Sequence, residues 1–263
     1  MNRMKIYKKR FLPLLFLLLV ISLFAETENQ KQEEKQSVEI NIDSFKKEIT
    51  EYYKPPDCFK LVFRTNINVP GYGVQSADGS VRADNKNNRI RIILVEANLG
   101  ITLSWITIIN NMAYLSNPRQ EGVIKLPVEK LQLGSLANNN IQLPFSLFQD
   151  ILFGRLPEEL IQSEQWQYEK NQFIGQYLGE DGALIIFYFD PIDKKRIQKI
   201  EYKKPIENYL AIANFEGKFY NTKYPKVLKI KTYQNAKPLE SMNIYFHRYI
   251  DNAWCKNEYF PIK

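Results

Sequence analysis

Residues 59–69, FKLVFRTNINV, decide the fold class of this chain. Apolar side chains occupy nearly every second position from Phe59 to Val69, and mostly polar side chains stand between them. Because successive side chains of a strand point to opposite faces, this alternation predicts a β-strand with one buried and one exposed face. Pro70 and Gly71 follow and end the strand. The stretch therefore predicts a sheet whose strands contribute one face to the core.

The same strand signals recur along most of the chain. Asp78-Gly79 predicts a hairpin within residues 75–82, and Asn110-Asn111 predicts a further turn. Short turns between consecutive strands favour an antiparallel meander. A sheet of about 11 strands is expected to curl, so we expect a mainly β fold, a half-open antiparallel β-barrel capped by a few short helices. Further strands are expected at residues 89–96, 101–109, 112–115, 166–169, 173–178, 183–189, 197–202, 209–215, 226–233 and 242–250.

Two segments have helical periodicity instead. Residues 42–53 repeat apolar side chains at helical spacing, with Asp43 or Ser44 as the N-cap, and Pro55 ends this helix. A second helix is expected from residue 145, after a proline, and it ends at a glycine. Its apolar stripe consists of Phe145, Phe148, Ile151 and Leu152.

The N-terminal segment predicts export. Basic residues at positions 3–10 precede an apolar run over residues 11–25, which is the layout of a secretory signal. The run is shorter than the ~20 apolar residues that a spanning helix needs. We expect residues 1–25 to be a signal, either cleaved after Ala25 or kept as an N-terminal anchor. Residues 26–41 are then a polar tether, and residues 42–263 form one domain.

The formal net charge of +7 overstates how basic the exported part is. The chain has 36 basic and 29 acidic residues, and five of the basic ones lie in the signal. The remaining 31 basic residues nearly balance the 29 acidic ones, for a net charge of +2. A nucleic-acid partner is therefore not expected, because it would need a clustered basic surface on a basic domain.

The chain has two cysteines, Cys58 and Cys255. In an oxidising compartment they could form one disulfide that closes a long loop. The alternative is two free thiols, each buried as a small apolar group.

Patterns of reactive side chains are missing from the sequence. Its one histidine, His247, lies in a strand-like run, where a structural role is expected. The cysteines are too few and too far apart for a zinc site. The sequence also lacks a nucleophile elbow, a phosphate loop and a dinucleotide fingerprint. We therefore expect no catalytic residues, no metal and no cofactor. The many apolar side chains of the predicted sheet favour binding of an apolar ligand.

Three segments, in this order, resemble the LolB-like group of the bacterial lipoprotein-localisation pathway. Residues 91–103, RIILVEANLGITL, look like the family's strand–turn–strand unit, whose tip carries an exposed leucine, here Leu99. Residues 141–157, IQLPFSLFQDILFGRLP, are similar to the family's helix that ends at a glycine. Residues 224–248 resemble its proline-led final strands. Together the resemblance covers residues 45–260.

The resemblance implies an apolar cavity that takes up the acyl chains of lipoproteins or other lipids. It also implies a place in the periplasm or at the periplasmic face of the outer membrane, with transfer of cargo to the inner surface of that membrane. Leu99 would be the membrane-insertion residue. The family's lipid-bearing cysteine after the signal is absent, so a soluble carrier and a chain held by an uncleaved signal are both open. We expect a monomer.

On this hypothesis, apolar residues of the sheet and of the second helix line the cavity. On the alternative, the same residues fill an ordinary core, and the protein is a non-catalytic envelope interaction protein with a protein partner. For residues 183–189 the sequence does not decide which alternate side chains point inward, because nearly every position is apolar. The expected cavity residues are Leu61, Phe63, Ile67, Ile92, Leu94, Leu103, Trp105, Phe148, Ile151, Leu152 and Ile186, with Leu184 and Tyr188 on the wall of Ile186.

Overall fold

The computed structural model describes residues 41–69, 73–116, 118, 122–133, 141–219, 223–251 and 255–262. The chain separates into two compact units, Met1–Asn41 and Ile42–Lys263, and the elements below belong to the second. The expected signal at 1–25 and the expected tether up to residue 40 lie outside the described residues. Within the described residues, no helix has the length and apolar character needed to cross a membrane.

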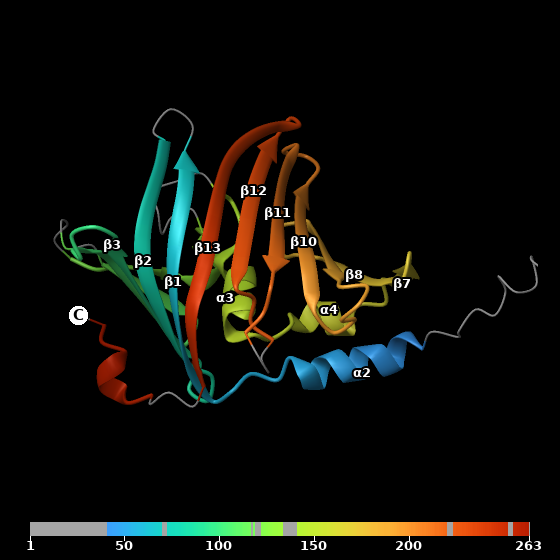
Figure 1. The fold of residues 1–263 in the computed structure, drawn as a ribbon, viewed down its shortest axis with the longest axis horizontal. Helices are drawn as coiled ribbons and strands as arrows, with labels where there is room; N and C mark the ends of the chain where they lie inside the picture. The colour runs from blue at the N-terminus through green and yellow to red at the C-terminus, as the bar shows by residue number, and fades with distance from the viewer. Residues whose placement is uncertain are drawn as a thin grey trace, which may run out of the picture. The chain divides into compact units, whose positions relative to one another are not determined.

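Strands dominate the described part of the second unit (Figure 1). The helices are α2 (Ile42–Tyr52), η1 (Val128–Lys130), α3 (Phe145–Phe153), α4 (Glu158–Gln162) and η3 (Asn257–Tyr259). The strands of the N-terminal half are β1 (Cys58–Val69), β2 (Gly73–Asp84), β3 (Arg89–Glu96), β4 (Thr102–Ile109), β5 (Met112–Ser116) and β6 (Ile124–Pro127). Those of the C-terminal half are β7 (Trp166–Glu169), β8 (Gln172–Leu178), β9 (Leu184–Phe189), β10 (Ile197–Lys204), β11 (Tyr209–Glu216), β12 (Val227–Gln234) and β13 (Lys237–Asp251).

The strands described form one 13-stranded antiparallel sheet, in the order β6-β5-β4-β3-β2-β1-β13-β12-β11-β10-β9-β8-β7. The chain builds it as two meanders. Strands β1 to β6 run outward to one edge, strands β7 to β13 return from the other edge, and β13 pairs with β1 in the middle. The sheet is open, with β6 and β7 as its edges. The predicted mainly β, open antiparallel architecture with few short helices is confirmed.

Strand β2 runs straight through Asp78-Gly79, where the sequence predicted a hairpin. Strands β1 and β2 instead pair without a break from Cys58↔Asp84 to Val69↔Gly73. Gly79 lies opposite Phe63, and a Cβ at Gly79 would lie 2.3 Å from Cζ of that ring. The hairpin prediction at this dipeptide is therefore wrong, because the glycine accommodates an aromatic ring and not a turn.

The predicted turn at Asn110-Asn111 is confirmed as the link between β4 and β5. Both asparagines have positive φ, 50° and 62°. Two consecutive residues with positive φ are what a two-residue type I′ hairpin requires, and asparagine tolerates this conformation better than most residues.

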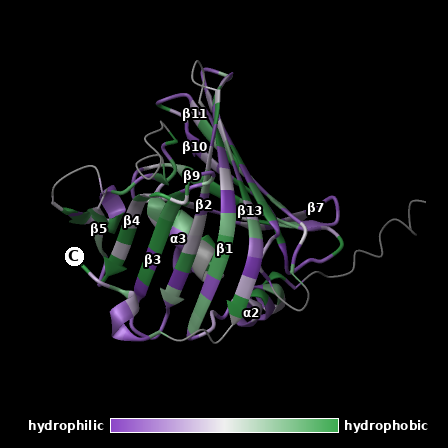
Figure 2. Cartoon of the chain, turned by 60° about the vertical axis from the view of Figure 1, so that its left-hand side comes forward, coloured by the Kyte–Doolittle hydropathy of each residue, from purple (hydrophilic) through white to green (hydrophobic). Residues whose placement is uncertain are grey.

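The backbone register divides the side chains between two faces of the sheet. Directly paired residues share a face, and the most continuous row crosses seven strands. Its members are buried, and Figure 2 shows the resulting alternation as coloured bands along β1. We call the face of this row the inner face and the opposite one the outer face. The row consists of Ile67, Met242, Ile230, Ala213, Ile200, Phe187 and Gly175.

Helix α2 covers part of the inner face. The ring of Phe45 stacks on Phe173 with centroids 3.6 Å apart and meets Trp166 and Phe189 edge-on. Just beyond the helix, the backbone N–H of Ile197 donates a 3.0 Å hydrogen bond to the hydroxyl of Tyr53. The predicted helix is thus present, and its apolar stripe anchors it to the C-terminal meander.

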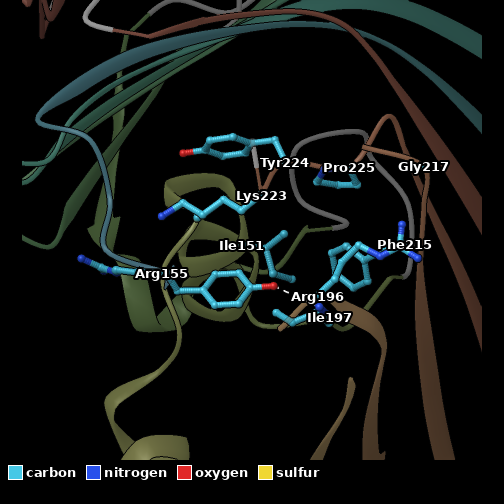
Figure 3. Close-up of a pocket in the computed structure, with 11 residues that line it drawn as sticks. Ile151, Arg155, Arg196, Ile197, Phe215, Gly217, Lys223, Tyr224 and Pro225 are labelled. Carbon is cyan, nitrogen blue, oxygen red and sulfur yellow. Dashed lines mark hydrogen bonds between the residues drawn. The ribbon is translucent and has the colours of Figure 1, made fainter. Parts of the chain in front are cut away.

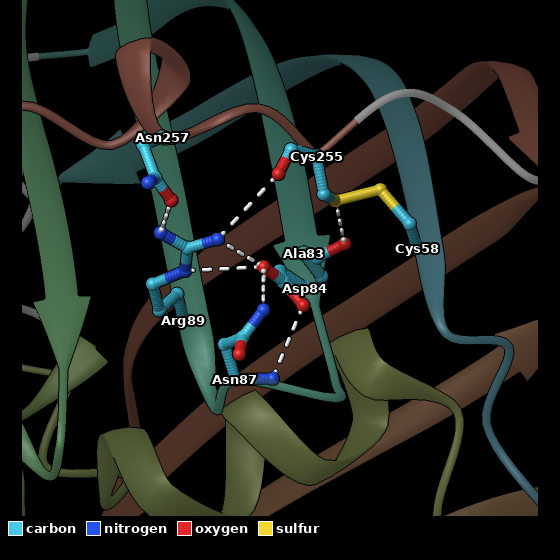
Figure 4. Close-up of polar contacts among 7 residues, drawn as sticks. All are labelled: Cys58, Ala83, Asp84, Asn87, Arg89, Cys255 and Asn257. Carbon is cyan, nitrogen blue, oxygen red and sulfur yellow. Dashed lines mark hydrogen bonds and ion pairs between the residues drawn. A yellow bond between two sulfur atoms is a disulfide. The ribbon is translucent and has the colours of Figure 1, made fainter.

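A disulfide joins the start of β1 to the C-terminal segment (Figure 4). Cys58 and Cys255 form it, with a Cα–Cα distance of 6.0 Å and a sequence separation of 197 residues. The sequence left open either one disulfide or two free thiols, and the structure contains the disulfide. Closing so long a loop restricts the unfolded chain and contributes about 2–4 kcal/mol.

A polar cluster holds the same C-terminal segment to the outer face. The guanidinium of Arg89 forms an ion pair with Asp84 and donates a 2.7 Å hydrogen bond to the side chain of Asn257 (Figure 4). The hydroxyl of Thr107, on β4, donates a 2.9 Å hydrogen bond to the carbonyl of Pro261. The segment, which includes η3, therefore crosses strands β2 to β4 on the face opposite α2 and α3.

Candidate functional site

The inner face brings together five of the expected cavity residues. Leu61, Phe63 and Ile67 alternate along β1, and each is at most 7% exposed. Ile92 and Leu94 of β3 join them, since both are linked to β1 through their pairs with β2. These residues form one apolar wall in the N-terminal meander.

Trp105 and Leu103 do not belong to that wall. Trp105 pairs with Ile93 and not with Ile92, so it lies on the outer face. A register shift beside Leu94 leaves Leu103 outside the regular pairing. The inner positions of β4 belong instead to Ile106 and Ile108, which are 2% and 0% exposed. The predicted placement of Trp105 is corrected here. Residues 101–105 alternate with their apolar side chains at odd positions, but Ile106 and Ile108 then place apolar side chains at even positions, so the alternation at the start of the strand indicated the wrong face.

The cavity residues expected on β9 also point to the outer face and not to the inner one. Ile186 pairs with Glu201 on β10 and Gln176 on β8, which places it on the outer face, although it is only 7% exposed. The inner positions of β9 belong to Ile185, Phe187 and Phe189. The expected wall of Ile186 with Leu184 and Tyr188 is therefore corrected to its neighbours along the strand.

Helix α3 lies over the inner face and supplies the expected cap. It begins after Pro144 and ends at Gly154, which has a φ of 64°. Phe148 is 5% exposed and Ile151 is half-buried, while the side chain of Leu152 lies outside the described residues. Gly154 is required for two reasons: its backbone is left-handed, and a Cβ there would lie 2.8 Å from the Tyr224 hydroxyl oxygen.

A pocket opens where α2, α3, β10 and β11 approach one another (Figure 3). Its cavity volume is about 20 Å³. A single water needs ~10–15 Å³ by the same measure, so the pocket holds a water or two and is too small for an acyl chain. The lining residues are Tyr53, Ile151, Gly154, Arg155, Arg196, Ile197, Phe215, Gly217, Lys223, Tyr224 and Pro225.

Two arginines at this pocket already have counter-ions. Arg155 contacts the carboxylate of Asp150 at 2.5 Å, and Arg196 pairs with Asp190. Burial raises the pKa of Asp150, and the nearby charge of Arg155 opposes that rise. Burial also raises the pKa of Tyr53 well above its ordinary value, so this phenol stays protonated. The Asp150–Arg155 pair spans the end of α3, and the Asp190–Arg196 pair closes the connection between β9 and β10.

Leu99 projects from the β3–β4 turn and is 74% exposed. The turn is well defined, because the carboxylate of Glu96 accepts hydrogen bonds from the backbone N–H groups of Asn98, at 2.9 Å, and Leu99. Gly100 completes it with a φ of 67°. The structure therefore places the leucine of the quoted LolB-like segment in an ordered, outward-facing position.

Other exposed aliphatic side chains lie at the same end of the strands. Because the sheet is antiparallel, the β1–β2, β3–β4, β5–β6, β8–β9 and β10–β11 connections share one end, which we call the hairpin end. Sequence reasoning missed these residues; an aliphatic side chain within a turn signal, as in Pro205-Ile206-Glu207, was the available clue. They are Val74, Ile101, Ile124, Leu178 and Ile206, exposed by 50–98%.

The fold is shared with solved structures of low sequence identity. A LolA superfamily protein from Nitrosomonas europaea aligns with a TM-score of 0.58 at 13% identity, over 84% of this chain and 98% of that one. A putative outer membrane lipoprotein-sorting protein domain from Vibrio parahaemolyticus aligns with a TM-score of 0.61 at 10% identity, over 83% and 95%. A DUF1329 family protein from Desulfovibrio piger aligns with a TM-score of 0.59 at 8% identity, over 83% and 95%.

This chain therefore has the fold of LolA superfamily proteins, an open half-barrel with short helices. At these identities the likeness establishes the fold alone, and it does not distinguish a LolB-like protein from other members. No family model matches the sequence, and no curated protein matches it.

Proposed function

We propose that this protein is a non-enzymatic carrier that binds the acyl chains of lipids or lipoproteins on the inner face of its half-barrel. The observation that carries the proposal is the continuous apolar inner face, which crosses the central strands of both meanders and is covered by short helices. The fold shared with a lipoprotein-sorting domain supports it. The N-terminal sequence supports a place in an exported compartment, at or near a membrane.

In this proposal, helix α3 occupies the space that cargo takes. Three aromatic and aliphatic side chains of α3, Phe145, Leu147 and Phe148, are at most 5% exposed. Burying side chains of this kind stabilises the closed state by about 1.5–3 kcal/mol each. An acyl chain gains about 0.8 kcal/mol for every methylene it buries, so roughly ten methylenes offset the loss of the helix contacts. A near balance suits a carrier, which must release its cargo as well as bind it.

Gly154 and the pocket lie where α3 would detach. The pocket separates Ile151 on the last turn of α3 from Phe215 on β11 and Ile197 on β10. A small gap at this point removes contacts that would otherwise hold the helix end, because a void forfeits dispersion contacts along its lining. We therefore place acyl-chain entry between the end of α3 and strands β10 and β11.

Leu99 is proposed to guide cargo at a membrane surface. It is exposed in an ordered turn and contributes little to the core. A monomeric protein that delivers lipid to the inner surface of the outer membrane would use such a side chain for transient insertion.

A test of the carrier function compares two variants of the exported protein. Ile151→Asp places a charge at the proposed entry, and Ile192→Asp places the same charge in the β9–β10 connection, where Ile192 is 94% exposed. Native mass spectrometry after incubation with a fatty acid or a short acylated peptide should show a bound ligand on the wild type and on Ile192→Asp. The Ile151→Asp variant should lose it. Absence of ligand from the wild type contradicts the proposal.

The second candidate is an envelope interaction protein with a filled interior. The observation that favours it is the pocket volume of about 20 Å³, which leaves α3 closely packed on the sheet. On this candidate, ligand never binds, and α3 stays as protected from hydrogen exchange as the strands under it. On the carrier proposal, the backbone amides of α3 exchange faster than those of β10 and β11.

A further inference from the structure

Exposed aliphatic side chains gather at the hairpin end of the sheet. Among the described residues, nine large apolar side chains are exposed, and seven of them lie there: Leu99, Val123 and the five named above for that end. The other two are Ile192, in the β9–β10 connection, and Ile262, in the C-terminal segment. Single exposed apolar side chains scattered over a surface are ordinary, but a group confined to one end of a sheet marks an interaction surface.

The connections at the opposite end of the strands are mostly polar. Those between β2 and β3, β4 and β5, and β7 and β8 consist of asparagine and lysine, as NKNN, NN and KN. Asparagine serves the turn there, since Asn88, Asn111 and Asn171 have positive φ. Leu178 and Ile206, at the hairpin end, have no positive φ that would explain the choice of residue. Their aliphatic side chains are therefore not a requirement of turn geometry.

The tip of the β10–β11 connection is held by its neighbour. Ile206 projects from this tip and is 98% exposed. Beside it, the ammonium of Lys204 lies 3.4 Å from the carboxylate of Asp181, in the β8–β9 connection. The hydroxyl of Tyr202 on β10 also donates a hydrogen bond to Asp181. These contacts brace the two hairpins against each other, so Ile206 stands on an ordered support.

A largely apolar row of cross-strand partners continues from these tips along the outer face. Leu178, which is 69% exposed, is the partner of Leu184 on β9. Across β10 the row continues through Lys203 to Leu210 on β11. Leu184 and Leu210 are partly exposed. A lysine in such a row can lay its aliphatic stem along the apolar surface and keep its ammonium outward.

This arrangement suits a lipid surface better than a folded partner. The aliphatic side chains stand on five separate connections, and neighbouring hairpins are about 10 Å apart, twice the spacing of strands. A partner helix or strand presents one stripe of apolar side chains, whereas the acyl region of a bilayer accepts each side chain independently. Residues 178–184 and 203–209 together carry two lysines and three acidic residues, so charge does not favour an anionic membrane.

We propose that the hairpin end docks on the surface of a zwitterionic lipid bilayer, with Leu178 and Ile206 inserted among the upper parts of the acyl chains. Val74 and Leu99 insert from other connections of the same end. Docking of this end extends the membrane step proposed for Leu99 and rests on that part of the proposed function. It does not require acyl-chain binding on the inner face.

The first test measures flotation of the exported protein with phosphatidylcholine vesicles, without fatty acid. We expect the wild type to bind and Ile206→Asp to bind about tenfold more weakly, the effect of no longer burying much of one isoleucine. Ile192→Asp is the matched control, because both isoleucines follow a proline, precede an acidic residue and are almost fully exposed. It should bind as the wild type does. Added salt should not weaken binding, since screening acts on charges and not on apolar insertion.

A second readout reports on this surface alone. The emission of Ile206→Trp should shift to shorter wavelength on phosphatidylcholine vesicles and be quenched by brominated acyl chains. Ile192→Trp should show neither change, because its end of the sheet stays in water. Both positions lie outside the core, so neither substitution should alter the free energy of unfolding by more than about 0.5 kcal/mol.

Four results would overturn the docking surface. They are absence of vesicle binding by the wild type, equal binding by Ile206→Asp and Ile192→Asp, loss of binding in salt, and no quenching in Ile206→Trp. Self-association that Ile206→Asp abolishes, without vesicle binding, would assign the surface to a second copy of the chain. Native mass spectrometry with fatty acid separates this test from that of the carrier function. Ile206→Asp should keep the fatty acid, and a protein that docks but takes up no fatty acid would contradict the carrier function alone.

Discussion

The two faces of the sheet differ in chemistry although they are made by the same strands. The inner face is a continuous apolar surface under short helices, and residues such as Phe187 and Ile200 are 1% exposed on it. The outer face carries ion pairs and the C-terminal segment held by a disulfide. The inner face holds the proposed cargo site, and we expect it to contribute more to stability than the outer face does.

The comparison is tested most strongly by truncating matched residues on the two faces. Ile200→Ala on the inner face should lower the free energy of unfolding by about 2–5 kcal/mol, because it leaves a cavity among packed side chains. Ile212→Ala, on the outer face of the neighbouring strand and partly exposed, should cost less than about 1 kcal/mol. Urea denaturation of both variants measures the difference, and equal losses would contradict the division into two faces.

The disulfide is expected to be the largest single contribution from the outer side. Replacing Cys58 and Cys255 together by serine should lower the free energy of unfolding by about 2–4 kcal/mol. The C-terminal segment should then become a site of early proteolysis, because only non-covalent contacts, such as those of Asn257 and Pro261, would still hold it to the sheet. A double variant as stable as the wild type, with the segment still protected from protease, would show that the polar cluster suffices.

Gly79 tests how closely the inner face is packed. Gly79→Ala should cost about 1–3 kcal/mol, because the new methyl group meets the ring of Phe63. In a Phe63→Leu background the same change should cost clearly less, since a smaller side chain leaves room. Thermal unfolding of the four proteins gives the coupling, and purely additive losses would show that the ring does not constrain this glycine.

Asp190 predicts how stability changes in acid. Burial alone would raise the pKa of this carboxyl, but hydrogen bonds from Arg196 and from the backbone N–H groups of Asp193 and Ile192 outweigh it and hold the pKa below its ordinary value. A carboxyl with a lowered folded-state pKa stabilises the protein above its unfolded-state pKa and loses that contribution as the pH falls through the folded value. We expect Asp190→Asn to flatten the fall in unfolding free energy below about pH 4, the ordinary range of aspartate. If the free energy of unfolding of Asp190→Asn fell with decreasing pH as steeply as that of the wild type, other carboxyl groups would be responsible for the loss of stability in acid.

Leu99→Glu should have the smallest effect on stability. Leu99 is 74% exposed, so the free energy of unfolding should change by less than about 0.5 kcal/mol. Delivery of bound acyl cargo to liposomes should nevertheless fall, because a charge opposes insertion. A matched control is Ile192→Glu at the opposite end of the strands. Unchanged delivery by Leu99→Glu would remove this residue from the proposed mechanism.

Much of the fold could be predicted from local patterns. Strand β1 alternates almost without exception, and the helices α2 and α3 have clear start and stop signals, so their positions follow from sequence. The expected inward residues were wrong at residues 101–109, where Ile106 and Ile108 break the alternation that begins the strand. They were also wrong at residues 183–189, where both faces of the strand are apolar and the sequence left the inward face undecided. In such a strand only the pairing with a neighbour decides which residue points inward, and that is a long-range property.

The candidate site was less accessible to sequence reasoning than the fold. Asp78-Gly79 has the composition of a turn, and only the ring of Phe63 on the partner strand explains why the glycine lies within β2. The pocket joins α2, α3, β10 and β11, which are far apart in the chain, so its lining could not be assembled from motifs.

The most direct measurement is photo-crosslinking of the exported protein with a fatty acid that carries a diazirine on its chain, followed by peptide mapping. We expect the label on α3 and on the inner-face positions of β10 and β11, with labelling suppressed by excess unmodified fatty acid. Labelling confined to outer-face positions, or no competable labelling at all, would contradict an inner face that opens to acyl chains.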